Sequence, residues 1–143
     1  MTAAGLRVVL VTFAGFVLVV LGLALVFGRQ LEPLEPAMHE PLLTMLGALA
    51  LAEVLALYFV RRRSRKTWME QLAARPYQPG GPLPPAYSSA VLIGAALCQG
   101  LGHFGAVVFA LTHRTGALAF GLLSILFILM QFPKDAHLVQ EPR

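Results

Sequence analysis

Residues 88–111, SSAVLIGAALCQGLGHFGAVVFAL, decide the fold of this chain. The stretch is apolar enough to cross a lipid bilayer, yet two polar residues, Gln99 and His103, lie near its middle. These two are four residues apart, so on a helix they share one face. Small residues close by leave room for another helix to approach: Gly102, Gly105 and Ala106. We therefore expect a transmembrane helix that is buried among neighbouring helices.

The composition indicates an integral membrane protein. Hydrophobic residues make up 57% of the 143 residues and charged residues only 13%, which does not suit a soluble domain. The formal net charge is +4, but most basic residues lie in one short stretch beside an apolar segment. Membrane topology explains them better than nucleic-acid binding, so we expect no nucleic-acid partner. Cys98, the only cysteine, lies in an apolar segment, where we expect a packing residue and no metal site.

Four apolar runs predict four transmembrane helices, each close to the roughly 20 residues that cross about 30 Å of hydrocarbon. The first run is too long for a cleaved signal peptide and lacks a clean cleavage site. The last is at the short limit for a span. The predicted helices are residues 8–28, 42–60, 90–111 and 116–132.

A basic stretch follows the second span directly. We expect it to continue the helix beyond the bilayer until Pro76, because a proline disfavours helix at the residue before it. Its side chains are predicted to lie at the lipid headgroups: Arg61, Arg62, Arg63, Arg65, Lys66 and Trp68. They either bind anionic lipid, at about 1 kcal/mol per basic residue, or simply fix the topology. We favour the second interpretation.

Residues 76–87 contain five prolines and two glycines and predict an extended linker that contributes neither helix nor core. The chain then divides into a first transmembrane hairpin with a basic juxtamembrane helix (1–75), the cytoplasmic linker (76–87), and a second hairpin with a cytoplasmic tail (88–143). The linker ends in a PPxY pattern, from Pro84 to Tyr87, of a kind that some aromatic-lined grooves bind. Such short patterns arise often by chance in proline-rich linkers.

The distribution of lysine and arginine predicts the orientation. One side of the predicted membrane holds Arg7, the basic residues of 61–75, Lys134 and Arg143, and the other holds only Arg29 and Arg114. By the positive-inside rule, both termini and the long linker are cytoplasmic. We expect a multi-pass protein of the cell inner membrane.

The predicted fold class is an all-α membrane protein with four transmembrane helices, arranged as two hairpins in parallel orientation. A pattern typical of the third and fourth helices of one group of membrane proteins recurs here, in Ala96, Leu97, Gln99 and Gly100 and then in Phe132 and Pro133. On these residues the chain resembles small, uncharacterised four-helix bacterial membrane proteins. Each hairpin also loosely resembles the rotor-ring subunits of rotary ATPases, although the fourth helix has Ser124 where those carry an acid.

Glu53 is the one charged residue within the second span. A carboxylate in a bilayer is costly, so we expect Glu53 to face the third helix and to hydrogen-bond with Gln99, His103 or both. We favour a structural role for this polar cluster, because three polar residues do not make a continuous path across the membrane; a proton or cation site is the alternative. A stripe of small residues on the same helix predicts helix packing: Ala48, Ala52 and Ala56.

The function predicted from these features is a structural or accessory subunit of a larger membrane complex. Its expected partners are anionic lipid headgroups and other membrane subunits or copies of itself. A proton- or cation-conducting subunit using Glu53, Gln99 and His103 is the first alternative. The second is a tetrapyrrole-binding electron-transfer subunit, in which His103 would be the axial ligand. We otherwise expect no cofactor and no enzyme activity, because no phosphate-binding loop, HExxH or GxSxG motif is present.

Overall fold

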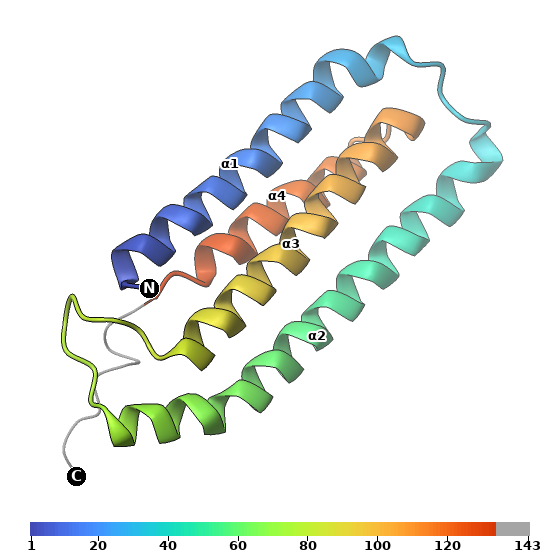
Figure 1. The fold of residues 1–143 in the computed structure, drawn as a ribbon. Helices are drawn as coiled ribbons and strands as arrows, with labels where there is room; N and C mark the ends of the chain where they lie inside the picture. The colour runs from blue at the N-terminus through green and yellow to red at the C-terminus, as the bar shows by residue number, and fades with distance from the viewer. Residues whose placement is uncertain (134–143) are drawn as a thin grey trace.

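The computed structural model describes residues 1–133 and contains four α-helices (Figure 1). They are α1 (Ala3–Phe27), α2 (His39–Ala74), α3 (Pro85–Thr112) and α4 (Gly116–Met130), with short 3-10 helices η1 (Gly28–Gln30) and η2 (Pro36–Met38) between α1 and α2. No strand occurs within these residues, so the predicted all-helical class is confirmed. Lys134, Arg143 and the rest of the predicted tail lie outside the described residues.

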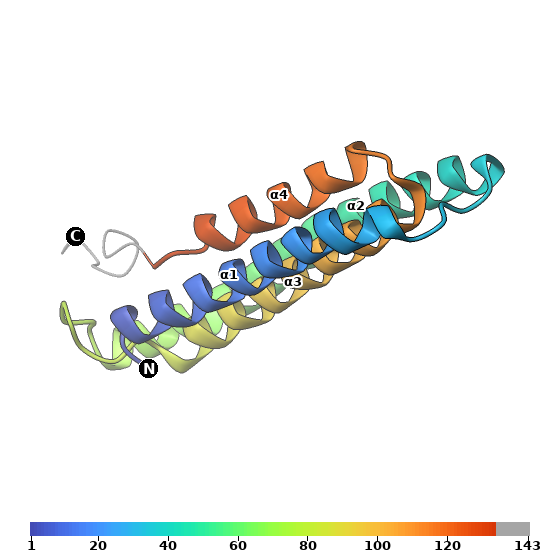
Figure 2. The same ribbon diagram turned by 90° about the horizontal axis from the view of Figure 1, so that it is seen from above.

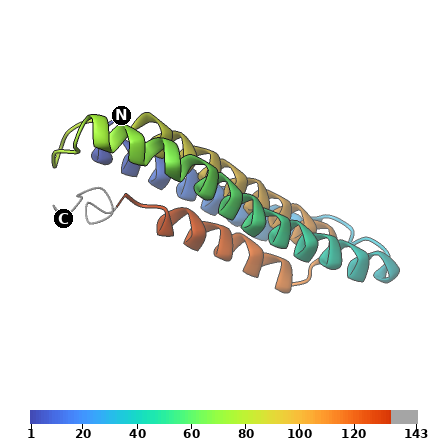
Figure 3. The ribbon, with the colours of Figure 1, turned by 90° about the horizontal axis from the view of Figure 1, so that it is seen from below.

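α3 is the central helix. It packs against α1, α2 and α4, whereas α1 and α2 scarcely touch each other within the described chain. α4 lies on one side of this arrangement, against α1 and α3 (Figures 2 and 3). α3 therefore lies between α1 and α2, and these two helices pack through it more than against each other.

The buried side chains follow one stripe on each helix that packs against α3. In α1 they are Leu6, Leu10, Ala14, Val17 and Leu21, spaced three or four residues apart. In α4 they are Ala117, Gly121, Ser124 and Ile128, with the same spacing. A spacing of three or four residues is typical of helices that pack side by side at small crossing angles.

Glycines set the distance between α3, α1 and α4. A methyl group added at Gly105 would lie 2.9 Å from the carbonyl oxygen of Ala117, which belongs to the backbone of α4. One added at Gly102 would lie 2.6 Å from Val17 of α1. On α4, a methyl group at Gly121 would lie 2.5 Å from Leu21. The three helices meet so closely here that no side chain fits at these three glycine positions.

The proline-rich linker differs from our expectation. The backbone N–H of Leu83 donates to the carbonyl of Met1 at 2.9 Å, and Pro82 forms an isolated bridge with Thr2. The Leu83 side chain is only 3% exposed and joins the core that α1 and α3 form. The linker thus does contribute to the core, because it lies along the beginning of the chain.

α4 is shorter than the other three helices. α2 runs through the basic stretch to Ala74 and Arg75 is extended, which confirms the predicted stop before Pro76. α1, α2 and α3 are long and apolar enough to cross a membrane. α4 has 15 residues, or about 22 Å at 1.5 Å per residue, which is shorter than a typical hydrocarbon core.

The glycine contacts give the first prediction. Gly105→Ala should destabilise the protein by about 1–3 kcal/mol, because the added methyl group meets the backbone of α4, which cannot move aside alone. Gly22→Ala is the matched control, since nothing lies within 4 Å of a methyl group there. The measurement is the unfolding midpoint in mixed detergent micelles. Equal midpoints for the two variants would contradict the close contact.

Candidate functional site

Glu53 lies on the side of α2 that packs against α3. The buried residues of α2 include His39, Leu46 and Glu53, each seven residues from the last, so they form one seam along the helix. Glu53 is only 9% exposed. Its Oε1 lies 3.9 Å from the position of a methyl group added at Gly100, and its carboxyl is near the backbone of Leu101. Glu53 therefore faces α3, at a point where α3 has no side chain in the way.

His103 points elsewhere. Its ring packs edge-on against Phe16 of α1, with the ring centroids 5.3 Å apart and the planes at 82°. Its Nε2 and the Oε2 of Glu53 are both buried and have no hydrogen-bond partner within residues 1–133. Gln99 is half-buried and makes no hydrogen bond in the same part of the chain. The structure thus does not join these three residues by the hydrogen bonds that we expected, because the His103 ring points from α3 toward α1, whereas Glu53 reaches α3 from α2.

Most of the alanine stripe of α2 is exposed within residues 1–133, so its predicted role in helix packing stays a prediction. Ala48 and Ala52 are exposed and Ala56 is half-buried. At about 100° per residue, Ala48 and Ala52 are on the face opposite the seam of Leu46 and Glu53. Both are therefore largely uncovered within residues 1–133, whereas Gly102, Gly105 and Ala106 are all buried at helix contacts.

Two polar contacts were not predicted from the sequence. The Ser124 hydroxyl donates to the carbonyl of Cys98, which ties α4 to α3 by a fully buried hydrogen bond. Gln131, at the end of α4, packs over Gly94, and its Nε2 lies 3.7 Å from the Cys98 sulfur. The sequence feature that could have predicted the first contact is Ser124 itself, because it is a lone polar residue in an apolar run, three positions after Gly121.

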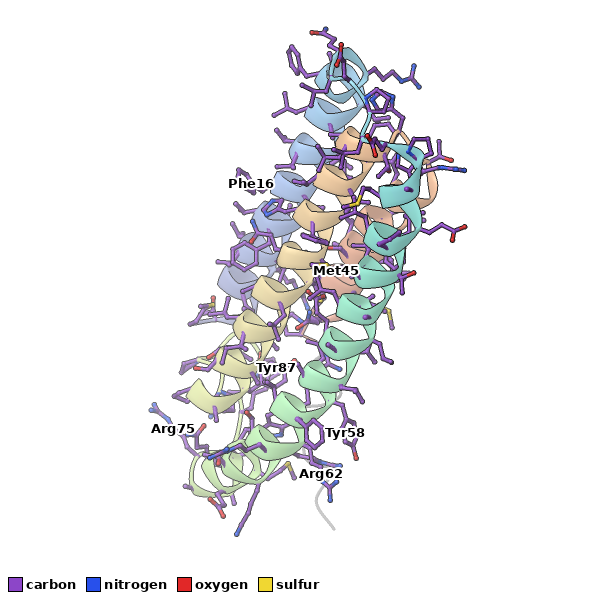
Figure 4. All side chains as sticks on the ribbon, turned by 90° about the vertical axis from the view of Figure 1, so that its right-hand side faces the viewer. Phe16, Met45, Tyr58, Arg62, Arg75 and Tyr87 are labelled. Atoms are coloured by element: carbon purple, nitrogen blue, oxygen red, sulfur yellow. The ribbon has the colours of Figure 1, made fainter. Side chains whose placement is uncertain are left out.

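The basic stretch forms one exposed end of the molecule. Arg61, Arg62, Arg63, Arg65 and Lys66 are all exposed on α2. Trp68 is half-buried and packs edge-on against Tyr87 of α3, with centroids 5.4 Å apart. Figure 4 shows Tyr58 and Arg62 on the outward side of α2, where the guanidinium donates to the Tyr58 hydroxyl at 3.4 Å. The PPxY segment begins α3 and its Tyr87 is half-buried, so it does not present an extended peptide.

Neighbouring helices occupy the space next to the small residues around His103. Gly102 is in contact with Val17 and Ser124, and Gly105 with Ala117. These neighbours fill the room that we expected the small residues to leave for a macrocycle. The geometry therefore gives no support to the electron-transfer alternative.

The unpartnered carboxyl oxygen of Glu53 gives the second prediction. Glu53→Leu should leave the unfolding midpoint in micelles unchanged or raise it, because a buried acceptor without a partner is replaced by an apolar side chain of similar size. Leu46→Ala, one heptad earlier, should lower stability by about 2–5 kcal/mol by leaving a cavity. Loss of stability in Glu53→Leu but not in Glu53→Gln would show instead that a hydrogen bond at this position holds α2 to α3.

No protein-family model matches the chain, and comparisons with curated proteins and with solved structures found no significant match. What the protein does must be inferred from its own residues and geometry.

Proposed function

We propose that this protein is a multi-pass membrane protein that acts as a structural or accessory subunit, using the outward face of α2 to pack against another membrane helix. Only 6% of the most apolar stretch of α2 is buried within the chain, compared with 50% for α3. This difference is the observation that carries the proposal.

The proposed insertion is two hairpins in the same orientation, with both termini in the cytoplasm. One end of the molecule gathers the N-terminus, the end of α2, the start of α3 and the end of α4 (Figure 1). The basic stretch of α2 belongs to this end, whereas Arg29 and Arg114 are the only lysines or arginines at the opposite end among residues 1–133. Such a bias supports insertion with the basic end inside.

Site-directed labelling tests this topology. Arg29→Cys and Arg114→Cys should react with a membrane-impermeant maleimide added from outside the inner membrane, and Arg63→Cys should react only when the cytoplasmic side is accessible. The unmodified chain is the control, because Cys98 is fully buried and should not react. Labelling of Arg63→Cys from the outside would contradict the orientation.

The face of α2 opposite α3 suits a partner helix better than it suits lipid alone. Thr44, Ala48 and Ala52 recur every four residues and are exposed, so they form a shallow strip along α2. Small residues at this spacing allow helix backbones to approach closely in a bilayer, where van der Waals packing and interhelical contacts drive association. Within the described chain, no other element covers this strip.

The strip gives the next prediction. Ala48→Leu with Ala52→Leu should leave the unfolding midpoint of the isolated protein unchanged, because both positions are exposed within residues 1–133. The same variant should lose membrane subunits that copurify with the wild-type protein in mild detergent. Ala119→Leu, which makes one such substitution at an exposed position of α4, is the control and should retain them. Equal retention by all three proteins would contradict a docking role for the strip.

Proton or cation conduction through Glu53, Gln99 and His103 is the second candidate. The buried, unpartnered Glu53 oxygen and His103 nitrogen favour it, since unsatisfied polar groups inside a membrane are commonly functional. Reconstituted protein should then carry protons into liposomes, and Glu53→Gln should abolish the flux without affecting the fold. Absence of flux in the wild-type protein would exclude this candidate.

A further inference from the structure

A groove lies at the basic end of the molecule, between α2, the first turns of α3 and the end of α4. Its volume is about 660 Å³. The groove follows from the helix lengths: α3 has 28 residues and α4 only 15, so α4 stops at Met130 and leaves the beginning of α3 uncovered on that side. α2, which continues to Ala74, forms the opposite wall.

The lining combines positive charge with an apolar wall. Arg61 and Arg65 of α2 stand on one side, and Val91, Met130 and Phe132 form an apolar surface facing them. Trp68 and Tyr87, which pack edge-on, lie at the α2–α3 side of the groove. No acidic residue lines the groove in the described chain. Its chemistry therefore favours a ligand with a negative headgroup and an apolar body.

The two arginines are available to a ligand. Both are exposed, and neither forms a salt bridge within residues 1–133. A second hollow of about 350 Å³ adjoins the groove and shares Arg61, Arg65 and Trp68 with it. Guanidinium groups bind phosphate oxygens in a bidentate manner, and tryptophan and tyrosine concentrate at the headgroup level of bilayers.

We propose that this groove binds one anionic phospholipid of the surrounding bilayer. Arg61 and Arg65 hold its phosphate, and the first part of one acyl chain lies against Val91, Met130 and Phe132. A volume of about 660 Å³ is within the usual range for small-ligand sites and takes a headgroup with part of a chain. The inference rests on the proposed membrane insertion, because the ligand is a component of the bilayer.

The test uses the full-length protein in mild detergent, titrated with phosphatidylglycerol or phosphatidylcholine of identical acyl chains. Native mass spectrometry measures how much protein retains one lipid. Wild-type protein should retain phosphatidylglycerol at roughly tenfold lower concentration than phosphatidylcholine. Arg61→Gln with Arg65→Gln should weaken phosphatidylglycerol retention about tenfold or more. Circular dichroism should show unchanged helix content, because both side chains are exposed.

The matched control is Arg63→Gln with Lys66→Gln. It removes the same charge from the same helix, but neither residue lines the groove, so retention should stay within about twofold of wild type. Glycerol 3-phosphate, which has the headgroup chemistry without acyl chains, should not displace the lipid at equal concentration.

Three outcomes would overturn the inference. Equal loss in the two double variants would indicate diffuse surface charge, and displacement by glycerol 3-phosphate would indicate a site for free phosphate. Failure of the wild-type protein to retain either lipid would leave the groove to another occupant, such as the C-terminal residues or a protein partner. Each outcome is distinguishable from failure of the proposed function, because the labelling experiment tests membrane insertion independently.

Discussion

The close approach of α3 to α1 and α4 is the contact on which the rest of the structure depends. At Gly102, Gly105 and Gly121 a side chain or backbone atom of a neighbouring helix takes the space that a side chain would fill. In a bilayer, lipid tails are as apolar as leucine, so helices associate through packing and interhelical hydrogen bonds rather than through the hydrophobic effect. The Ser124 hydroxyl bond to the Cys98 carbonyl adds such a link at the same junction.

α2 lies outside the junction of α1, α3 and α4 and packs mainly against α3. α1, α3 and α4 surround one core, which includes Leu10, Val17, Ala95 and Ile128. α2 contributes Leu46 to a second, smaller core with Leu101 and Phe109, and otherwise touches α3 along a single seam. A helix held on one side only keeps most of its apolar surface for lipid or for a partner. The placement of Glu53 in this seam, rather than on the free face, follows from the cost of a carboxyl group exposed to lipid.

The sequence predicted the helices well, because their number and their approximate ends depend on the length of apolar runs and on prolines. It also predicted that residues around His103 permit close packing, since small side chains carry that information directly. It did not predict which faces meet. The expected contact between Glu53 and His103 depended on the rotation of each helix about its axis, which the sequence does not define, and the structure turns His103 toward Phe16. For the alanine stripe, the spacing likewise identified a face of α2 but not whether a helix of this chain or of a partner covers that face.

The short α4 connects the packing to the basic end. Its last turn ends at Met130, where Gln131 closes the helix with a backbone bond to Ile128 and packs over Gly94. Two residues later, the carbonyl of Pro133 accepts a hydrogen bond from the Arg7 guanidinium at 3.2 Å. The chain therefore leaves α4 toward α1 and away from α2. α2 and α3 therefore continue past the end of α4 with one side uncovered. In the proposed insertion, a helix of about 22 Å crosses a bilayer of about 30 Å, and the difference requires thinning or lipid adjustment near its ends. The uncovered side lies where such an adjustment is needed, and its arginines and aromatic residues match the headgroup layer that would reach into it.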